Sequence, residues 1–129
     1  MVQIRVLGLA ILFPVLLLAA CAVQSNTAGQ AVAAYFQALV DKDAEKLASL
    51  SCRDWEASAR TELESFGAVA VTLEGLGCQE SSQDGDNAVV TCTGKIIANY
   101  GNEILEINLA DRQYLAVKEG GDWRMCGYH

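Results

Sequence analysis

The strand pairing in the second half of the chain follows from one segment, CQESSQDGDNAVVTC, residues 78–92. Its centre, residues 81–87, consists of Ser, Gln, Asp, Gly and Asn, a composition rich in turn formers. Apolar residues then recur at every second position, at Ala88, Val90 and Cys92. Folding the segment about Gly85 sets Cys78 opposite Cys92, and cross-strand Cβ atoms lie about 4.5–5.5 Å apart. The segment therefore predicts a β-hairpin closed by a disulfide.

The same periodicity predicts strands on both sides of this hairpin. Apolar residues alternate before Gly75 and change parity after it, which is typical of a β-bulge beside a glycine. Gly101-Asn102 is a two-residue hairpin signal. The resulting register pairs Val71 with Ala98, Leu73 with Ile96, Ala98 with Leu105, and Ile96 with Ile107. Three strands therefore share one apolar face, since a one-residue error would invert a strand. After a turn at 119–122, residues 123–128 form a fourth strand.

The first half of the chain has helical periodicity and predicts three helices. Thr27 and Gln30 have the spacing of a capping box. The apolar stripe after them comprises Val32, Tyr35, Phe36, Leu39 and Val40. We expect Asp43 to cap a second, short helix and Asp54 to cap a third helix that stops at Gly67.

The start of the chain has the pattern of an export signal. An uncharged run, residues 6–20, follows Arg5 and leads into Cys21. As a helix it would span about 22 Å, short of the roughly 30 Å hydrocarbon core, and Pro14 interrupts it, so a membrane-spanning helix is a weaker alternative. A plain secretory signal cut after Ala20 is another. The ending Leu18-Ala19-Ala20-Cys21 resembles the lipobox of bacterial lipoproteins, which implies cleavage between Ala20 and Cys21 and a lipid on the Cys21 sulfur.

This resemblance divides the chain into three parts: residues 1–20 as lipoprotein signal peptide, 21–28 as lipidated cysteine and short tether, and 29–129 as one domain. It also implies a domain held by its lipid on the extracytoplasmic side of the cell membrane or the outer membrane. In diderm bacteria, retention in the inner membrane is usually associated with Asp after the cysteine. Ala22 at that position favours an outer-membrane or surface location.

Composition narrows the classes of partner. Removal of residues 1–20 from the 129-residue chain takes away Arg5 and leaves 8 basic against 16 acidic side chains. An acidic chain without a cationic cluster argues against nucleic-acid binding and against electrostatic adhesion to anionic lipid headgroups. The membrane partner is therefore expected to be reached through the N-terminal lipid alone.

Four cysteines remain after Cys21, an even number that implies disulfides in a small exported domain. Three pairings are possible in principle, and the strand register selects Cys78–Cys92. Cys52–Cys126 is then left to join the helical half to the last strand. We expect no metal and no other cofactor, because no CxxC motif or histidine cluster is present and the one histidine, His129, is the last residue.

Two motifs connect this order of elements to a known fold. They are AAYFQALVDKDAEKL, residues 33–47, and GDWRMCG, residues 121–127. Both resemble the nuclear transport factor 2-like (NTF2-like) fold, also called cystatin-like or ketosteroid-isomerase-like, over residues 29–129. The resemblance implies an α+β domain with three N-terminal helices packed on a curved four-stranded antiparallel sheet. Small exported members often carry a cysteine after the second helix and another after the terminal Trp, which matches Cys52 and Cys126.

The same resemblance suggests a pocket between helices and sheet. Tyr35 falls where ketosteroid isomerase keeps its hydrogen-bond-donating tyrosine, and Trp55 could line the pocket. That enzyme's general-base aspartate has no counterpart, because Asp54 lies at a helix start. Asp111 is expected to face inward on the third strand, opposite Cys92, with Arg112 on the outer face.

Three functions are consistent with these features. The first is a lipid-anchored, non-catalytic binding or interaction module for an unknown protein or small molecule, which we favour because the chain has no Ser-His-Asp set and no free nucleophilic cysteine. The second is a ketosteroid-isomerase-type enzyme using Tyr35 and Asp111. The third is an assembly subunit that forms a homodimer through the outer face of the sheet, around Val89, Thr91, Thr93, Lys95 and Ile97.

Overall fold

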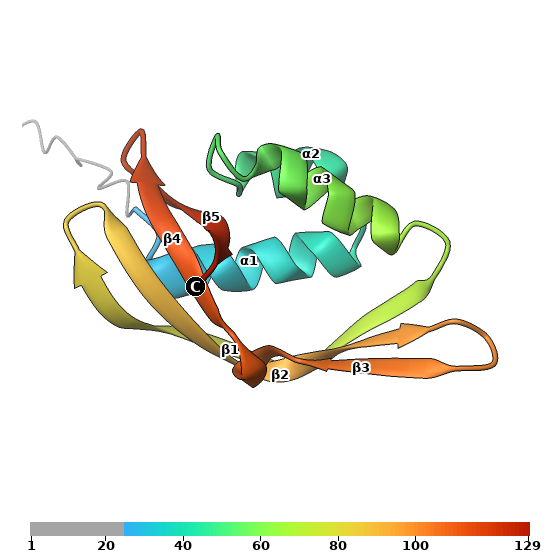
Figure 1. The fold of residues 1–129 in the computed structure, drawn as a ribbon. Helices are drawn as coiled ribbons and strands as arrows, with labels where there is room; N and C mark the ends of the chain where they lie inside the picture. Colours follow the sequence, from blue (N-terminus) through green and yellow to red (C-terminus); the bar gives the residue numbers. More distant parts are fainter. Residues whose placement is uncertain (1–24) are drawn as a thin grey trace, which may run out of the picture.

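The computed structural model describes residues 25–129, an α+β domain in which three helices precede an antiparallel sheet (Figure 1). The helices are α1 (Ala28–Val40), α2 (Ala44–Ser49) and α3 (Glu56–Ser65). The strands are β1 (Ala70–Asp84), β2 (Asn87–Asn99), β3 (Ile104–Asn108), β4 (Gln113–Glu119) and β5 (Asp122–Tyr128), with a 3-10 turn, η1 (Leu109–Asp111), between β3 and β4. The predicted fold class is thus confirmed, whereas the predicted signal peptide and the predicted cleavage and lipidation residues, Ala20 and Cys21, lie outside the described residues. Within 25–129, none of the helices has the length and apolar character required to cross a bilayer.

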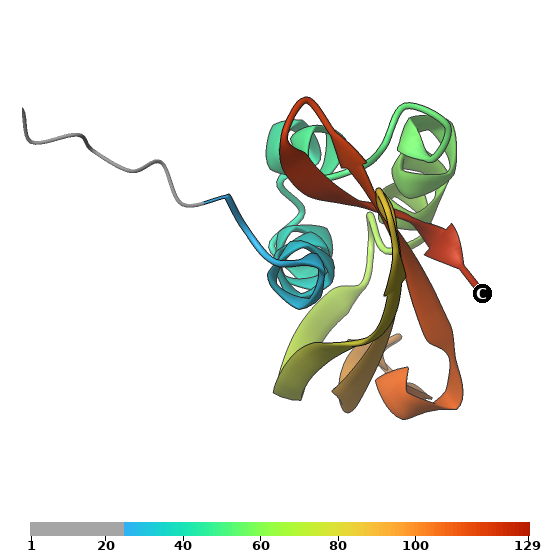
Figure 2. The ribbon, with the colours of Figure 1, turned by 90° about the vertical axis from the view of Figure 1, so that its left-hand side faces the viewer.

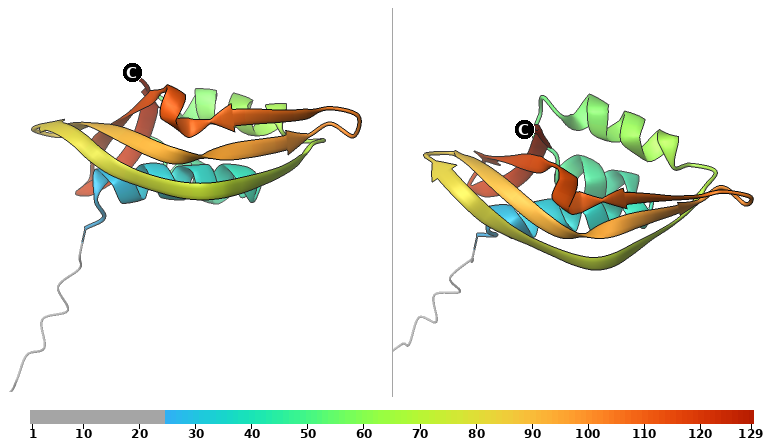
Figure 3. Two further views of the ribbon diagram at one scale, coloured as in Figure 1. Left: turned by 90° about the horizontal axis from the view of Figure 1, so that it is seen from below. Right: turned by 60° about the horizontal axis from the view of Figure 1, so that its bottom comes forward.

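The sheet curls around α1. Strand order is β1-β2-β4-β5, and β3 pairs with the far end of β2. Helix α1 contacts β1, β2, β4 and β5, and Figure 2 shows it on the concave side of the sheet. Seen from below, the strands β1, β2 and β3 lie in front of the helices (Figure 3, left), so the helices cover one face of this part of the sheet.

The predicted strand register is confirmed. Cys78 pairs with Cys92, Leu73 with Ile96, Val71 with Ala98, Ala98 with Leu105, and Ile96 with Ile107. The register shift between Glu74 and Gly77 is the expected bulge, and a second shift between Glu80 and Ser82 was not predicted. The polar segment 81–87 is mostly strand rather than turn, because Asp84 still pairs with Asn87 and only two residues form the reversal.

The predicted third strand is divided in two. Leu109, Ala110 and Asp111 form η1, where the Asn108 side chain accepts a hydrogen bond from the Ala110 N–H at 3.0 Å. The cause lies in β2, which bends at Gly94, whose φ is +98°. One straight strand cannot follow both arms of a bent neighbour, so β3 pairs with one arm and β4 with the other. The sheet therefore has five strands rather than the expected four.

Two of the three predicted helix N-caps are confirmed. Thr27 and Gln30 form the predicted capping box of α1, and the Asp43 side chain caps α2. The expectation that Asp54 caps α3 is wrong: the N-cap is Trp55, with no side-chain cap. Instead, the Cys52 carbonyl accepts hydrogen bonds from the backbone N–H groups of Trp55 and Glu56, so a turn leads directly into the helix.

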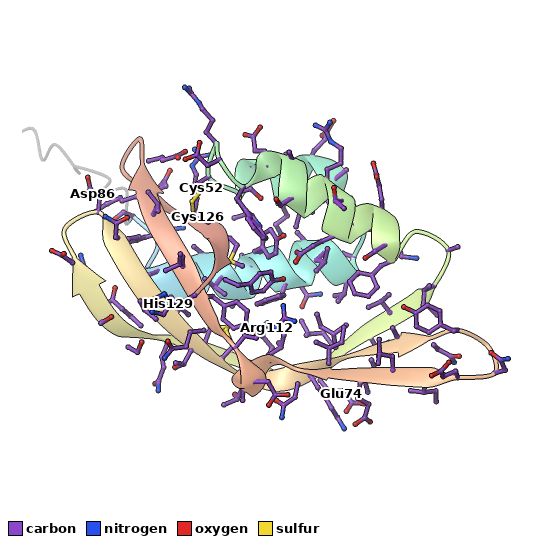
Figure 4. All side chains as sticks on the ribbon, viewed as in Figure 1. Cys52, Glu74, Asp86, Arg112, Cys126 and His129 are labelled. Atoms are coloured by element: carbon purple, nitrogen blue, oxygen red, sulfur yellow. A yellow bond between two sulfur atoms is a disulfide. The ribbon has the colours of Figure 1, made fainter. Side chains whose placement is uncertain are left out.

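Two disulfides join the pairs expected from the sequence. Cys78–Cys92 bridges β1 and β2 with a Cα–Cα distance of 4.1 Å. Cys52–Cys126 joins the turn before α3 to β5 with a Cα–Cα distance of 5.2 Å (Figure 4). Backbone hydrogen bonds strengthen this second junction, because Cys52 N–H donates to the Met125 carbonyl at 2.8 Å. The start of α3 and the end of β5 are therefore fixed to each other.

Candidate functional site

A cavity of about 260 Å³ lies between the helices and the bend of the sheet. Its apolar walls come from α1, the end of α3, η1, and the part of the sheet where β3 pairs with β2. They are formed by Phe36, Leu39, Phe66, Ile96, Ile107 and Leu109. Polar groups are contributed by Glu62, Ser65, Asn108, Arg112, Tyr114 and Tyr128. An apolar cavity with a few convergent polar groups is the usual form of a small-molecule site.

The polar centre of this cavity is the Glu62 carboxylate on α3. Tyr35 from α1 donates its hydroxyl proton to Oε2 of Glu62 at 2.6 Å. Tyr128 from β5 donates its hydroxyl proton to Oε1. Trp55 Nε1–H in turn donates to the Tyr35 hydroxyl oxygen at 3.1 Å. Both carboxylate oxygens are thus held by donors from different elements, which fixes the side chain against the cavity.

Burial keeps these tyrosines protonated. Desolvation is the largest cause that raises the pKa of Tyr35 above its ordinary value of about 10, and the hydrogen bond to Glu62 adds to it. Desolvation also raises the pKa of Tyr128, followed by the negative charge of Glu62. The hydroxyls therefore remain donors at all physiological pH values, and the network keeps one arrangement of protons.

Ring packing holds the Tyr128 donor in place. Its ring meets Trp55 edge-on, with centroids 5.4 Å apart, and lies 5.6 Å from Tyr114. Gly127 allows this approach, because a Cβ at that position would lie 3.2 Å from the Trp55 ring and its φ is +117°. The Cys52–Cys126 bridge lies three residues before Trp55 and one residue before Gly127, so it restrains the site as well as the fold.

Arg112 forms the other polar edge of the cavity. Its guanidinium lies over the Tyr128 ring, 5.0 Å from the centroid, a cation–π geometry. Figure 4 shows Arg112 at the bend of the sheet. The expectation that Arg112 points to the outer face is wrong, because η1 interrupts the two-residue alternation on which it was based. Among residues 25–129, no carboxylate lies within salt-bridge distance of this guanidinium.

Comparison with known proteins identifies the fold. No family model and no curated protein matches the sequence. Among solved structures, a candidate dehydratase of the NTF2-like family from Streptomyces avermitilis aligns with a TM-score of 0.52 and 18% identity, over 78% of this chain and 88% of that one. A candidate scytalone dehydratase from Novosphingobium aromaticivorans aligns with a TM-score of 0.52 and 19% identity, over 74% of each chain. The fold is NTF2-like.

A third similar structure carries a different kind of name. It is a candidate association domain of calcium/calmodulin-dependent protein kinase type II from Thiobacillus denitrificans, with a TM-score of 0.50 and 16% identity, over 77% of this chain and 89% of that one. At these identities the similarity establishes the NTF2-like fold and leaves the role of the cavity to its own chemistry.

The NTF2-like domain brings together two of the three predicted pocket residues. Trp55 donates a hydrogen bond to Tyr35, and Tyr35 donates one to Glu62, although neither Tyr35 nor Trp55 lines the cavity. Asp111 does not join them. It lies exposed on η1 and does not line the cavity, so the predicted inward position is wrong for the same reason as for Arg112.

Sequence reasoning missed Glu62, the central group of the site. A signal for it was present: Glu62 lies three residues after the buried Ala59, on the apolar side of α3 that was read from Trp55, Ala59 and Leu63. A carboxylate in such a stripe requires donors nearby, since an unpaired buried charge is strongly unfavourable.

The arrangement is suited to holding a ligand. A general base needs a lone pair directed at the proton that it removes, and here each Glu62 oxygen accepts one tyrosine proton, which leaves fewer lone pairs for a substrate. Metal chemistry has no obvious ligand set in residues 25–129, where no group of three or more His, Cys, Asp or Glu side chains converges. The NTF2-like domain therefore presents an apolar chamber with a fixed polar network on its wall.

Proposed function

We propose that this domain is a non-catalytic binding module for a small, largely apolar molecule. The observation that carries the proposal is the Glu62 carboxylate, which lines the cavity and is held by the hydroxyls of Tyr35 and Tyr128. These hydrogen bonds hold the cavity wall in one shape, and ligand binding would not require them to break. The volume of about 260 Å³ is slightly below the roughly 300–1,000 Å³ typical of ligand sites, which favours a compact ligand.

Two of the similar structures are named as candidate dehydratases, so catalysis is the alternative to consider. Dehydration requires a group that takes up a proton and another that gives one to the leaving oxygen. The raised pKa values make Tyr35 and Tyr128 weak acids, and their protons are already directed at Glu62. These features support binding in preference to proton transfer.

We further propose that a lipid on Cys21 holds the domain at a bacterial envelope membrane. The basis is the lipobox-like ending Leu18-Ala19-Ala20-Cys21. If this anchor exists, the domain must lie close to the bilayer. The Asn26 side chain accepts from Trp123 N–H at 2.8 Å and donates to the Trp123 carbonyl at 2.9 Å, so the chain is attached to β5 only five residues after Cys21. Five residues reach at most about 18 Å.

Cavity binding can be tested with a pair of variants on one helix. Ser65 and Thr61 are both exposed residues of α3 whose hydroxyls donate to backbone carbonyls, but only Ser65 lines the cavity. We expect Ser65→Phe to fill the chamber and Thr61→Phe to leave it open. The probes are phenylacetate, 2-phenylethanol and phenethylamine, which share one ring and differ in their polar ends.

Calorimetric titration of the full-length protein is expected to show that at least one probe binds to the wild type and to Thr61→Phe. The same probe should not bind to Ser65→Phe. If no probe binds to the wild type, or if binding is equal in all three proteins, the cavity is not a ligand site of this kind.

The anchor has a separate test. We expect the intact mass of the protein purified from its native membrane to lack residues 1–20 and to include an acyl increment. Reduction should add four protons, two for each disulfide. A product that still carries residues 1–20 would contradict the proposed anchor and leave the binding proposal unaffected.

A further inference from the structure

The cavity contains hydrogen-bond donors that the protein itself does not use. In its one carboxylate, Glu62, each oxygen accepts one tyrosine proton, and the Tyr114 hydroxyl donates to the Leu109 carbonyl at 2.7 Å. Asn108, an exposed residue, uses its Oδ1 to accept from Ala110 N–H, and its Nδ2 protons meet no protein acceptor within 25–129, so a ligand could replace water there. With the guanidinium of Arg112, the lining beside η1 therefore has donors without a protein acceptor in the described residues.

Arg112 is exposed at the edge of the cavity, and its charge makes it the stronger of these donors. Its planar guanidinium lies over Tyr128, and stacking of this kind leaves the N–H groups at the edge of the plane free to bind another molecule. Arg112 and Asn108 flank η1 and both line the same cavity. The nearest fixed charge in the lining, Glu62, forms no ion pair with Arg112 in the described part of the chain.

We propose that the ligand of this cavity is a small apolar carboxylic acid, bound as its carboxylate by Arg112 and Asn108, with its apolar part against Phe66 and Ile107. This inference rests on the proposed binding function. A carboxylate matches a guanidinium in a planar, two-bond geometry, and it supplies the acceptors that both donors lack. The apolar walls then contact the rest of the molecule.

The net charge of the chain makes the role of Arg112 in this proposal testable. The chain carries a formal net charge of −7, so its long-range field repels anions. Binding of a carboxylate would therefore depend on the local cation in the cavity and would be lost with it. An ammonium ligand, in contrast, would be attracted by the whole protein and would not need Arg112.

The test compares the three probes on the full-length protein in phospholipid nanodiscs, with empty nanodiscs as the blank. We expect phenylacetate to bind at least tenfold more tightly than 2-phenylethanol or phenethylamine. Arg112→Gln should weaken phenylacetate binding at least tenfold and leave 2-phenylethanol binding unchanged. Arg112→Lys, which keeps the charge and loses the planar fork, should give an intermediate affinity, and Arg53→Gln, an exposed arginine that does not line the cavity, should have no effect.

The outcomes separate this inference from the function on which it rests. Equal or tighter binding of the alcohol or the amine, with sensitivity to Ser65→Phe, overturns the carboxylate assignment and supports the binding module. Phenylacetate binding that persists in Arg112→Gln or in Ser65→Phe also overturns the assignment. Failure of all three probes to bind overturns both.

Discussion

Removal of the Tyr128 hydroxyl should destabilise the domain measurably. Tyr128→Phe deletes one oxygen and keeps the ring that contacts Trp55, Tyr114 and Arg112. The lost interaction is a hydrogen bond to a carboxylate, a class that contributes about 1.5–3 kcal/mol. The carboxylate would keep its bond from Tyr35 but lose its other protein donor. We therefore expect the free energy of unfolding at pH 7 to fall by about 1.5–3 kcal/mol.

The effect should depend on pH in a defined direction. Burial, and then Glu62, raises the pKa of Tyr128 in the folded state above its ordinary value of about 10. The folded protein thus holds this proton more tightly than the unfolded chain does. The contribution of the hydroxyl to stability is therefore complete below about pH 10 and is lost as the pH rises further. The difference between wild type and Tyr128→Phe should shrink above that pH.

Urea denaturation followed by tryptophan fluorescence measures this difference at pH 7, 9, 10.5 and 11.5. Tyr100→Phe is the matched control, because Tyr100 is 48% exposed. A double-mutant cycle with Glu62→Gln isolates the pair and should give a coupling of about 1 kcal/mol or more. A loss for Tyr128→Phe no larger than that for Tyr100→Phe, or a coupling near zero, would refute the proposed network.

Three further predictions concern the scaffold and use the same denaturation assay. Replacing Cys52 and Cys126 together by Ala opens a link between residues 74 apart, and the chain-entropy model gives a loss of about 4.5 kcal/mol; a loss below about 1 kcal/mol would contradict it. Gly94→Ala should lower the free energy of unfolding by more than about 2 kcal/mol, because its Cβ would lie 2.5 Å from a backbone oxygen at a φ of +98°. The control Gly120→Ala has a φ of +59° and open space around the Cβ, and it should lower the free energy of unfolding by about 1 kcal/mol. Burial raises the pKa of Tyr114 to about 12, so its contribution should be lost between about pH 10 and pH 12, and Tyr114→Phe should flatten the alkaline decline in stability.

The strand register could be predicted because its determinants are local. The parity change at Gly75 and the turn at Gly101-Asn102 are visible within a few residues, and the observed pairs match the expected ones. The break at Leu109–Asp111 could not be predicted in this way. It results from the bend of β2 at Gly94, a neighbouring strand, and the segment itself still alternates in the pattern of a continuous strand.

The site was predictable only in part, for a related reason. Tyr35 was predicted as a pocket residue and instead bonds to a lining residue, Glu62, which is 27 residues away; Tyr128 is a further 66 residues along the chain. These groups meet only when α1, α3 and β5 are packed around the same cavity. Asp111 and Arg112 depart from their expected sides because one 3-10 turn interrupts the alternation: both are exposed to solvent, but Arg112 lines the cavity and Asp111 does not.

The elements that hold this fold together are also those that position the polar groups of the cavity. Cys52 lies three residues before Trp55, and Cys126 lies two residues before Tyr128, so one disulfide restrains two side chains of the network around Glu62. Leu50 and Cys52 also bond to the Met125 backbone, which aligns the turn before α3 with β5. The Tyr128 side chain that follows this junction provides both the donor to Glu62 and the ring over which Arg112 lies. Tyr128 therefore links the stability of the fold to the proposed ligand site: its hydroxyl bonds to Glu62, and its ring lies under the Arg112 guanidinium.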